Sequence, residues 1–262
     1  MSENKKTWSV AAEIRAEQKA ALKDMSRKEK LNYFWEYYKM HTIATVIILC
    51  LFISIIHNVI TNKPYSFYAI VLNAIELDSD VLGEEFSQFA GIDNTRYNCF
   101  IDTGHHLNTM DVSPYEMALV QRMMATVAAG HLDSVVTDGF TFIYFADNEF
   151  FTDLSTILSA EQLKLFEGNL YYIDKAHIER RNANTDIDSI MFMEVLDIEQ
   201  QLKEVEKRRQ PENMEKPIPV GIVLSDSAIL QNSLLSDAVP VLGVIASSDR
   251  KEEAVKLAEF LW

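Results

Sequence analysis

The stretch at residues 42–60 reads TIATVIILCLFISIIHNVI and contains no Asp, Glu, Lys or Arg. In the chain as a whole 24% of the residues are charged, so this stretch stands apart from its surroundings. As a helix rising about 1.5 Å per residue it would be about 28 Å long, close to the thickness of the hydrocarbon core of a bilayer. We therefore predict a transmembrane helix over residues 41–61, with Thr42–Ile60 in contact with the lipid bilayer.

A buried core helix and a cleaved signal peptide are the two alternatives to an anchor. Against a core helix, charged residues stop abruptly at Lys39 and resume at Lys63, and aromatic residues gather between positions 33 and 38, where rings settle at a membrane surface. Against a signal peptide, the apolar run begins after forty residues and ends in HNVI instead of a small-residue cleavage site. Leu49 before Cys50 also departs from a lipoprotein signal, so we expect an uncleaved anchor.

The basic residues beside the span predict its orientation. Four of them precede it and one follows it: Arg27, Lys28, Lys30 and Lys39, then Lys63. By the positive-inside rule the N-terminus is cytoplasmic. We expect a cytoplasmic helical segment at 1–40, a linker at 62–65 and an extracytoplasmic domain at 66–262, in a single-pass protein of the cell membrane.

The charge of the chain is unevenly distributed. Residues 1–40 hold nine Lys or Arg and six Asp or Glu, whereas residues 61–262 hold fifteen and thirty-three. So acidic a domain repels nucleic-acid phosphates, and we expect no nucleic-acid partner. The two cysteines, Cys50 in the span and Cys99 outside it, predict neither an intramolecular disulfide nor a metal knuckle, which fits a bacterial surface better than a eukaryotic secreted module.

Beyond residue 65, β-rich runs alternate with helical patterns. The strands are expected at 66–73, 96–102, 132–137, 170–173, 190–195, 218–224 and 239–245, and the helices at 79–89, 114–129, 198–215 and 249–262. Ser26 and Glu29 form a capping-box pattern that starts the helix leading into the span. The alternation favours an α/β domain, with a mixed, mostly parallel sheet and flanking helices.

One continuous piece carries a family resemblance. Residues 116–158 read EMALVQRMMATVAAGHLDSVVTDGFTFIYFADNEFFTDLSTIL, in which a helix ends in Ala-Ala-Gly, a strand opens with Leu-Asp, Asp138 follows it and FFTDL comes later. This resembles type 2 periplasmic solute-binding proteins, and the PVGI and VLGVI runs with the final helix are similar to the closing part of such domains. The segment NYFWEYYKMH followed by the span also resembles a group of membrane-anchored proteins of clostridial bacteria.

The resemblance implies a ligand-binding α/β fold with a reduced second lobe, because the interval before the closing strands is short and is partly filled by a charged helix. Ligands of such sheets lie at the carboxyl ends of the strands. The residues expected there are Asn73, Asp102, Thr103, Asp138, Phe140, Ser225 and Asp226. Each could instead be an ordinary loop or capping residue.

Metal and catalytic sites are not expected. Asp102, His105 and His106 with Asp111 could in principle hold a divalent ion, but adjacent histidines usually point apart and HExxH spacing is lacking. The sequence contains no GxSxG elbow, P-loop or GxGxxG motif. Asp133 and Asp138, about 16 Å apart along a strand, are too distant to share one substrate bond.

We therefore expect a protein without cofactor or enzymatic activity. The leading hypothesis is a membrane-anchored domain that binds or senses a small molecule. The rival is a structural or interaction subunit of a cell-envelope complex, with a membrane protein as its partner. A hydrolase is a third, less favoured reading.

Overall fold

A computed structural model of the chain describes residues 25–61, 63–108, 113–184 and 198–262, and six further residues between 12 and 19. It divides into two compact units, Met1–Asn62 and Lys63–Trp262. The strand expected at 190–195 and most of the helix expected before residue 25 lie outside the described residues.

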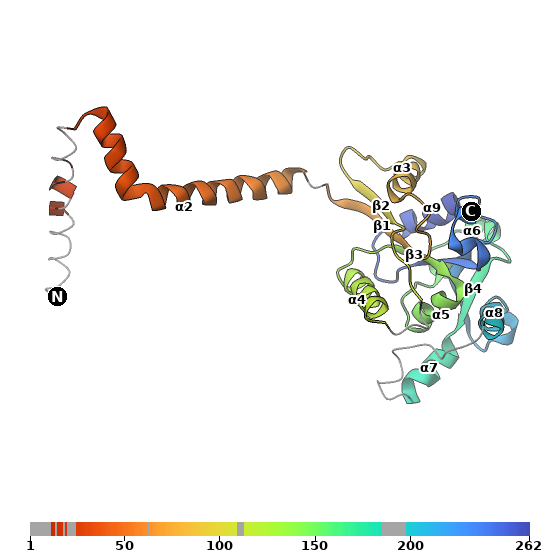
Figure 1. Cartoon of the computed structure of the whole chain (residues 1–262). Coiled ribbons are helices and arrows are strands. Elements are labelled where there is room, and N and C mark those ends of the chain that lie inside the picture. Colours follow the sequence, from red (N-terminus) through yellow and green to blue (C-terminus); the bar gives the residue numbers. More distant parts are fainter. Residues whose placement is uncertain are drawn as a thin grey trace. The chain divides into compact units, whose positions relative to one another are not determined.

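The first unit is dominated by α2, Arg27–Thr61 (Figure 1). Its start is the predicted capping box, because the Ser26 backbone N–H donates to Glu29 Oε2 at 2.7 Å and the Glu29 N–H donates to Ser26 Oγ at 3.4 Å. The hydrogen bond from the Ser26 N–H, followed by the Ser26 hydroxyl beside the carboxylate, lowers the pKa of the Glu29 carboxyl. Within α2, Tyr38–Val59 has a mean hydropathy of 2.3 and none of it is buried, so the helix is long and apolar enough to cross a membrane.

The second unit is an α/β domain built on one six-stranded sheet with flanking helices, which confirms the α/β part of the predicted fold class. Its strands are β1 (Tyr65–Val71), β2 (Asn98–Asp102), β3 (Ser134–Asp138), β4 (Leu170–Asp174), β5 (Pro217–Val223) and β6 (Pro240–Val244). Its helices are α3 (Ser79–Ala90), α4 (Pro114–Ala128), α5 (Gly139–Asp147), α6 (Ala160–Leu165), α7 (Lys175–Asn184), α8 (Ile198–Lys207) and α9 (Lys251–Leu261).

The sheet is mixed, but the expectation that it is mostly parallel is wrong. The strand order is β2-β1-β3-β6-β5-β4. β1 pairs in parallel with β2 and β3, whereas the pairs β3–β6, β5–β6 and β4–β5 are antiparallel. The chain between β5 and β6 forms only short 3₁₀ turns. It therefore enters β6 at the end of the sheet where β5 finishes, and the two strands run antiparallel; a parallel pair would need a crossover connection.

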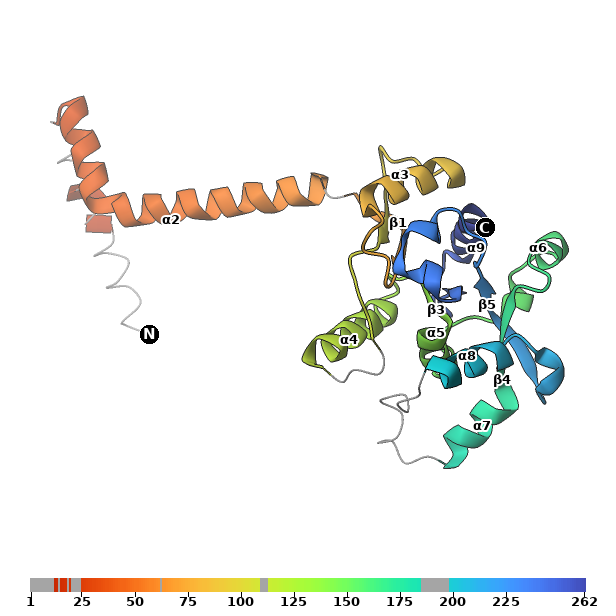
Figure 2. The same ribbon diagram turned by 45° about the vertical axis from the view of Figure 1, so that its right-hand side comes forward.

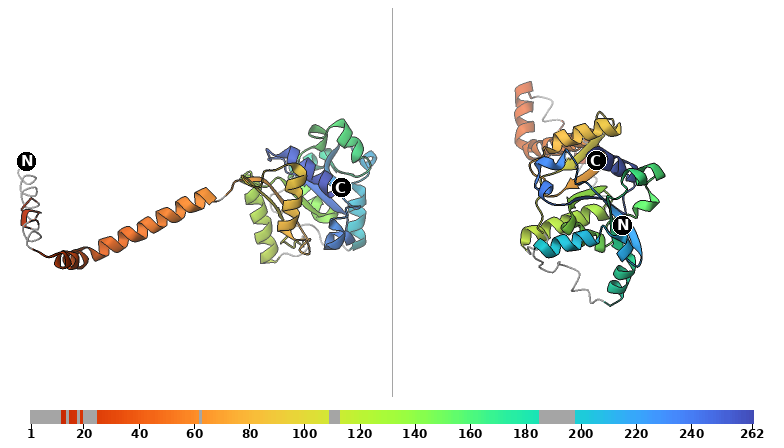
Figure 3. Two further views of the ribbon diagram at one scale, coloured as in Figure 1. Left: turned by 90° about the horizontal axis from the view of Figure 1, so that it is seen from above. Right: turned by 90° about the vertical axis from the view of Figure 1, so that its right-hand side faces the viewer.

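Helices cover both faces of the sheet (Figure 3). One apolar core joins α3, α6 and α9 to one face, and a second joins α4, α5 and α8 to the other. α5 and α8 lie side by side in this second layer, as Figures 1 and 2 show. The apolar stretch 140–145 therefore forms a buried helix, since nearly every side chain of α5 is covered.

Two glycines allow a close aromatic contact on the second face. Gly221 of β5 and Gly243 of β6 are directly paired. The rings of Phe142 and Phe151 stack on each other with their centroids 4.3 Å apart, and both rings lie against this glycine pair. A Cβ added to Gly243 would lie 2.4 Å from the Phe151 ring. The sheet can therefore accept these rings only where it lacks side chains.

The connections around β1 create a topological switch point. β1 leads into α3 on one face, whereas the neighbouring β3 leads into α5 on the other. The chain thus departs in opposite directions from the carboxyl ends of two adjacent parallel strands. Open α/β sheets bind ligands in the crevice at such a position.

Candidate functional site

Two of the predicted residues meet at the switch point. Asn73 follows β1 and Asp138 ends β3, and Asn73 Nδ2 donates to Asp138 Oδ2 at 3.3 Å. Asn73 has a positive φ of 59°, a conformation that Asn adopts more readily than most residues. The structure therefore brings these two expected residues together, and their role in ligand binding stays a prediction.

The crevice between them is closed by the chain itself. Asn73 Oδ1 accepts from the Leu107 N–H at 2.9 Å and Asn73 Nδ2 donates to the Leu107 carbonyl at 3.2 Å. The Asn73 N–H donates to the His105 carbonyl at 2.9 Å, and the Leu107 side chain is 2% exposed. Asp138 also caps α5 by accepting from the Thr141 N–H at 2.8 Å. The polar groups expected to hold a ligand thus hold the loop 103–108 in place.

A second polar cluster lies at the end of β2, which we call the Asp102 cluster: Tyr68, Asp102, His105 and Arg122. Asp102 Oδ2 accepts from Tyr68 Oη at 3.3 Å and lies 3.2 Å from His105 Nε2. Arg122 of α4 reaches both groups, 4.0 Å from Asp102 Oδ2 and 3.1 Å from His105 Nε2. The cluster spans β1, β2 and α4, and it opens to solvent through Arg122, whose side chain is 60% exposed.

The position of the His105 ring proton sets the hydrogen bonds of this cluster. With the proton on Nδ1, Nε2 can accept a hydrogen bond from Arg122, whereas with the proton on Nε2 the same atom can donate to Asp102. Burial, followed by the negative charge of Asp102, raises the pKa of Tyr68 to about 12. Tyr68 therefore remains a hydrogen-bond donor at neutral pH.

The other predicted residues do not converge on these two places. Thr103 is 2% exposed, and its hydroxyl donates to the Leu77 carbonyl at 2.6 Å, which fixes the start of α3. Phe140 is 6% exposed and packs in the core. Ser225 and Asp226 are exposed after β5, separated from β3 by β6. Within the described chain neither of them bonds to Asn73, Asp102 or Asp138.

The histidine loop does not gather a metal set in the part of the chain that the structure describes. His105 faces Asp102, whereas His106 is exposed. Among the described residues no three His, Cys, Asp or Glu side chains surround a common point. Asp111, the remaining candidate ligand, lies outside the described residues.

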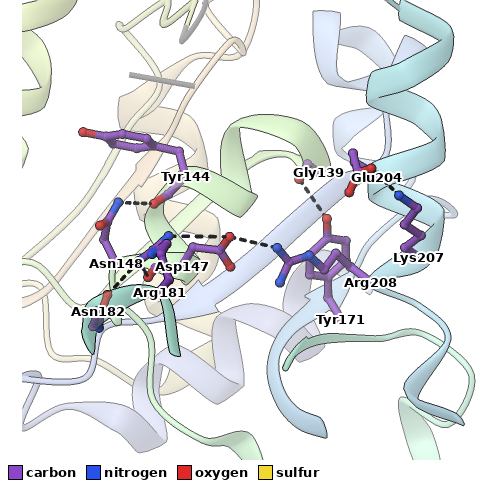
Figure 4. A network of polar contacts seen from close by, with 10 residues as sticks. All are labelled: Gly139, Tyr144, Asp147, Asn148, Tyr171, Arg181, Asn182, Glu204, Lys207 and Arg208. Carbon is purple, nitrogen blue, oxygen red and sulfur yellow. Dashed lines mark hydrogen bonds and ion pairs between the residues drawn. The ribbon is translucent and has the colours of Figure 1, made fainter. Parts of the chain in front are cut away.

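A further polar network fastens α7 and α8 to α5 (Figure 4). Asp147 Oδ2 accepts from Arg208 at 2.8 Å, and Arg181 donates to the Asp147 carbonyl. Beside it the buried Tyr171 hydroxyl donates to the Gly139 carbonyl at 3.0 Å, and burial raises the pKa of Tyr171 well above its usual value. These contacts are internal to the domain and explain how polar helices stay attached to the sheet.

Sequence reasoning missed Tyr68 and Arg122. Tyr68 was read only as part of a strand, and its partner Asp102 is 34 residues away. The sequence does single out Arg122, because it is the one Lys or Arg between positions 97 and 163 and lies on a helix that is otherwise mostly apolar. A lone cation in such a helix often has a specific acidic partner.

No family model matches this chain, and the searches of curated proteins and of solved structures return no match either. The resemblance to solute-binding proteins stays a prediction, and so do the roles that it implies.

Proposed function

We propose that this chain is a single-pass membrane protein that holds an α/β domain at the surface of the bilayer. The observation that carries the proposal is the long apolar surface of Tyr38–Val59, none of which is buried within the described residues. Thr42–Ile60 supplies the lipid contact. Basic residues before the span favour a cytoplasmic N-terminus and an extracytoplasmic domain.

Reporter fusions test the topology. An enzyme that is active only outside the cell, fused after Trp262, is expected to be active, and the same enzyme fused before residue 1 is expected to be inactive. The reverse pattern would refute the orientation. Extraction of the protein by carbonate without detergent would refute the membrane span.

For the domain itself we propose a structural or interaction role in an envelope complex, with a membrane protein as partner and without enzymatic activity. The closed crevice supports this proposal, because the side chain of Asn73 is committed to Leu107 and Asp138. A ligand there would have to break these hydrogen bonds before making its own. Surface recognition requires no such opening.

Small-molecule binding is the second candidate, and the Asp102 cluster favours it. A mostly buried carboxylate, an imidazole and a partly exposed guanidinium meet there, which is a set that can recognise a polar ligand. Of the ligand residues expected from the sequence, this candidate keeps Asp102 and leaves out Asn73 and Asp138. It keeps the expectation of a binding protein without cofactor.

One experiment separates the two candidates. The full chain in detergent is screened by thermal shift against sugars, amino acids and peptides, beside the matched variant Arg122→Gln. A ligand at 100 times its Kd adds about 2.7 kcal/mol, or about 5–11 °C for a domain of this size. A shift in the parent chain that is lost in Arg122→Gln would support the second candidate. No shift, with a membrane protein co-purifying from detergent in defined ratio, would support the interaction role.

A further inference from the structure

The linker to the span is fastened to one edge of the sheet. The Pro64 carbonyl accepts from the Asn98 N–H at 2.9 Å, and the Lys63 carbonyl accepts from Asn98 Nδ2 at 3.2 Å. The Lys63 ammonium also donates to the Asn94 carbonyl. Residue 62 alone lies between α2 and this fastened segment, so the Cα atoms of Thr61 and Lys63 are at most about 7 Å apart.

We call this end of the sheet, where the strands begin or end beside the linker, the proximal edge. Within the four strands nearest the linker, it carries the N-terminal ends of β1, β2 and β3 and the C-terminal end of β6, because β6 runs antiparallel to β3. The start of β5 and the end of β4 lie at the same end of the sheet but farther from the linker in the strand order, and they are not counted in this edge. Its segments are 63–64, 91–97, 129–133 and 245–250. The headgroup layer of a bilayer is about 5–8 Å thick on each side, so the length of the linker allows this edge to reach the headgroups.

The charge of the proximal edge differs from that of the rest of the domain. Its segments hold three basic and three acidic residues, and the acidic Asp133 is buried against Arg250 at 2.9 Å. At the opposite edge of the same strands, the segments 72–78, 103–108 and 224–235 together with Asp138 hold four acidic residues and no Lys or Arg. An anionic lipid surface repels the second edge but not the first.

Exposed tyrosines mark the proximal edge. Tyr65 is 53% exposed and Tyr97 is 43% exposed. The Tyr65 ring is held in place, since its centroid lies 6.0 Å from that of Tyr68 and 6.5 Å from that of Phe100. Tyr rings prefer the interface between hydrocarbon and water, where the ring is shielded and the hydroxyl stays hydrated.

From these observations we infer that the proximal edge is a lipid-contact surface, in which Tyr65 and Tyr97 insert among the headgroups of the bilayer that anchors the chain. The inference rests on the proposed membrane span and adds which side of the domain faces the lipid. It leaves the acidic opposite edge, with the Asp102 cluster, directed toward the solvent.

Photo-crosslinking in vesicles tests this orientation. Four variants of the full chain each carry a benzophenone amino acid at one position: 65, 97, 115 or 52. Each variant is reconstituted in vesicles of phosphatidylcholine with one fifth phosphatidylglycerol. Tyr115 is the matched control, because it is also 53% exposed but opens α4 at the opposite edge, about 20 Å away along strands such as β1. Phe52 lies within the span and reports the span itself. All four positions are exposed, so the substitutions leave the core intact.

We expect lipid adducts at positions 52, 65 and 97, with yields at 65 and 97 about tenfold above that at 115, as the steep boundary between headgroups and water implies. Adducts at 52, with yields at 65 and 97 no higher than at 115, would overturn the lipid-contact surface and leave the span standing. An absence of adducts at 52 would overturn the span, and with it both proposals.

Discussion

Replacing Asp133 by Asn tests the ion pair that joins the start of β3 to the loop after β6, beside a hydrogen bond from β1. Asp133 is fully buried, and its carboxylate accepts three hydrogen bonds: from the Tyr68 N–H at 2.8 Å, the Ser248 hydroxyl at 2.7 Å and Arg250 Nε at 2.9 Å. An Asn side chain has the same shape but offers one acceptor oxygen, and its amide group would face a donor.

The expected loss is substantial because Arg250, whose side chain is 29% exposed, loses its charged partner, and one of the other donors around position 133 loses its acceptor. Breaking a fully buried pair costs about 3–5 kcal/mol, and the partial exposure of Arg250 places the expected loss at the lower end, about 3 kcal/mol, which for a domain of this size lowers the Tm by about 6–12 °C. The control is Glu215→Gln, which breaks an ion pair with Arg180 at 2.6 Å whose side chains are 64% and 59% exposed. Exposed pairs contribute at most about 1 kcal/mol, so the control should lower the Tm by less than about 4 °C.

The assay is thermal unfolding of the full chain in detergent, followed by near-ultraviolet circular dichroism. Arg250→Met and the double variant with Asp133→Asn complete a cycle, and the double variant should lose less stability than the two single variants together. A Tm change for Asp133→Asn no larger than that of Glu215→Gln would refute the reasoning, and so would strict additivity of the two changes.

Three further predictions use the same assay or a simple titration. Asn73→Gly and Asn73→Ala both lose the side-chain bonds that close the crevice, but Ala should be about 1 kcal/mol less stable because Asn73 has a positive φ; equal stabilities would contradict this. Gly243→Ala should destabilise by about 1–3 kcal/mol or more, since its Cβ would overlap the Phe151 ring, and a neutral result would show that the ring can move. The pKa of Tyr68, about 12, lies above the ordinary value of 10, so the contribution of the Tyr68 phenol to stability is fully present below pH 10 and is lost as the pH rises to 12. The variant Tyr68→Phe should therefore remove one phenol that ionises late in an ultraviolet titration. An unchanged titration curve would contradict the raised pKa of Tyr68.

Local signals predicted most of the elements. Ser26 and Glu29 identified the start of α2, and Pro114 identified the start of α4, since both patterns act within one helical turn. The β-rich runs likewise placed β1, β2 and β3 within a few residues. Such elements are specified by neighbouring residues, so the sequence displays them directly.

Pairing between distant segments was not visible in the same way. The β-rich pattern predicts that β6 exists. Whether β6 runs parallel or antiparallel to its neighbours depends on how the chain connects it to β5. The partnership of Tyr68 with Asp102 and Arg122 depends on three elements meeting in space. Asn73 and Asp138 were found because the ends of parallel strands meet at one edge, yet nothing in their identity showed that Leu107 would occupy the space between them.

The sheet order has a consequence for how the domain is made. β6 lies in the middle of the sheet, between β3 and β5, although it is the last strand in the chain. While the protein is being synthesised, the two halves of the sheet lack the strand that joins them, and the edges of β3 and β5 remain unpaired. The domain therefore completes its fold only after β6 has been synthesised, and until then the open edges of β3 and β5 are exposed to pairing with other chains.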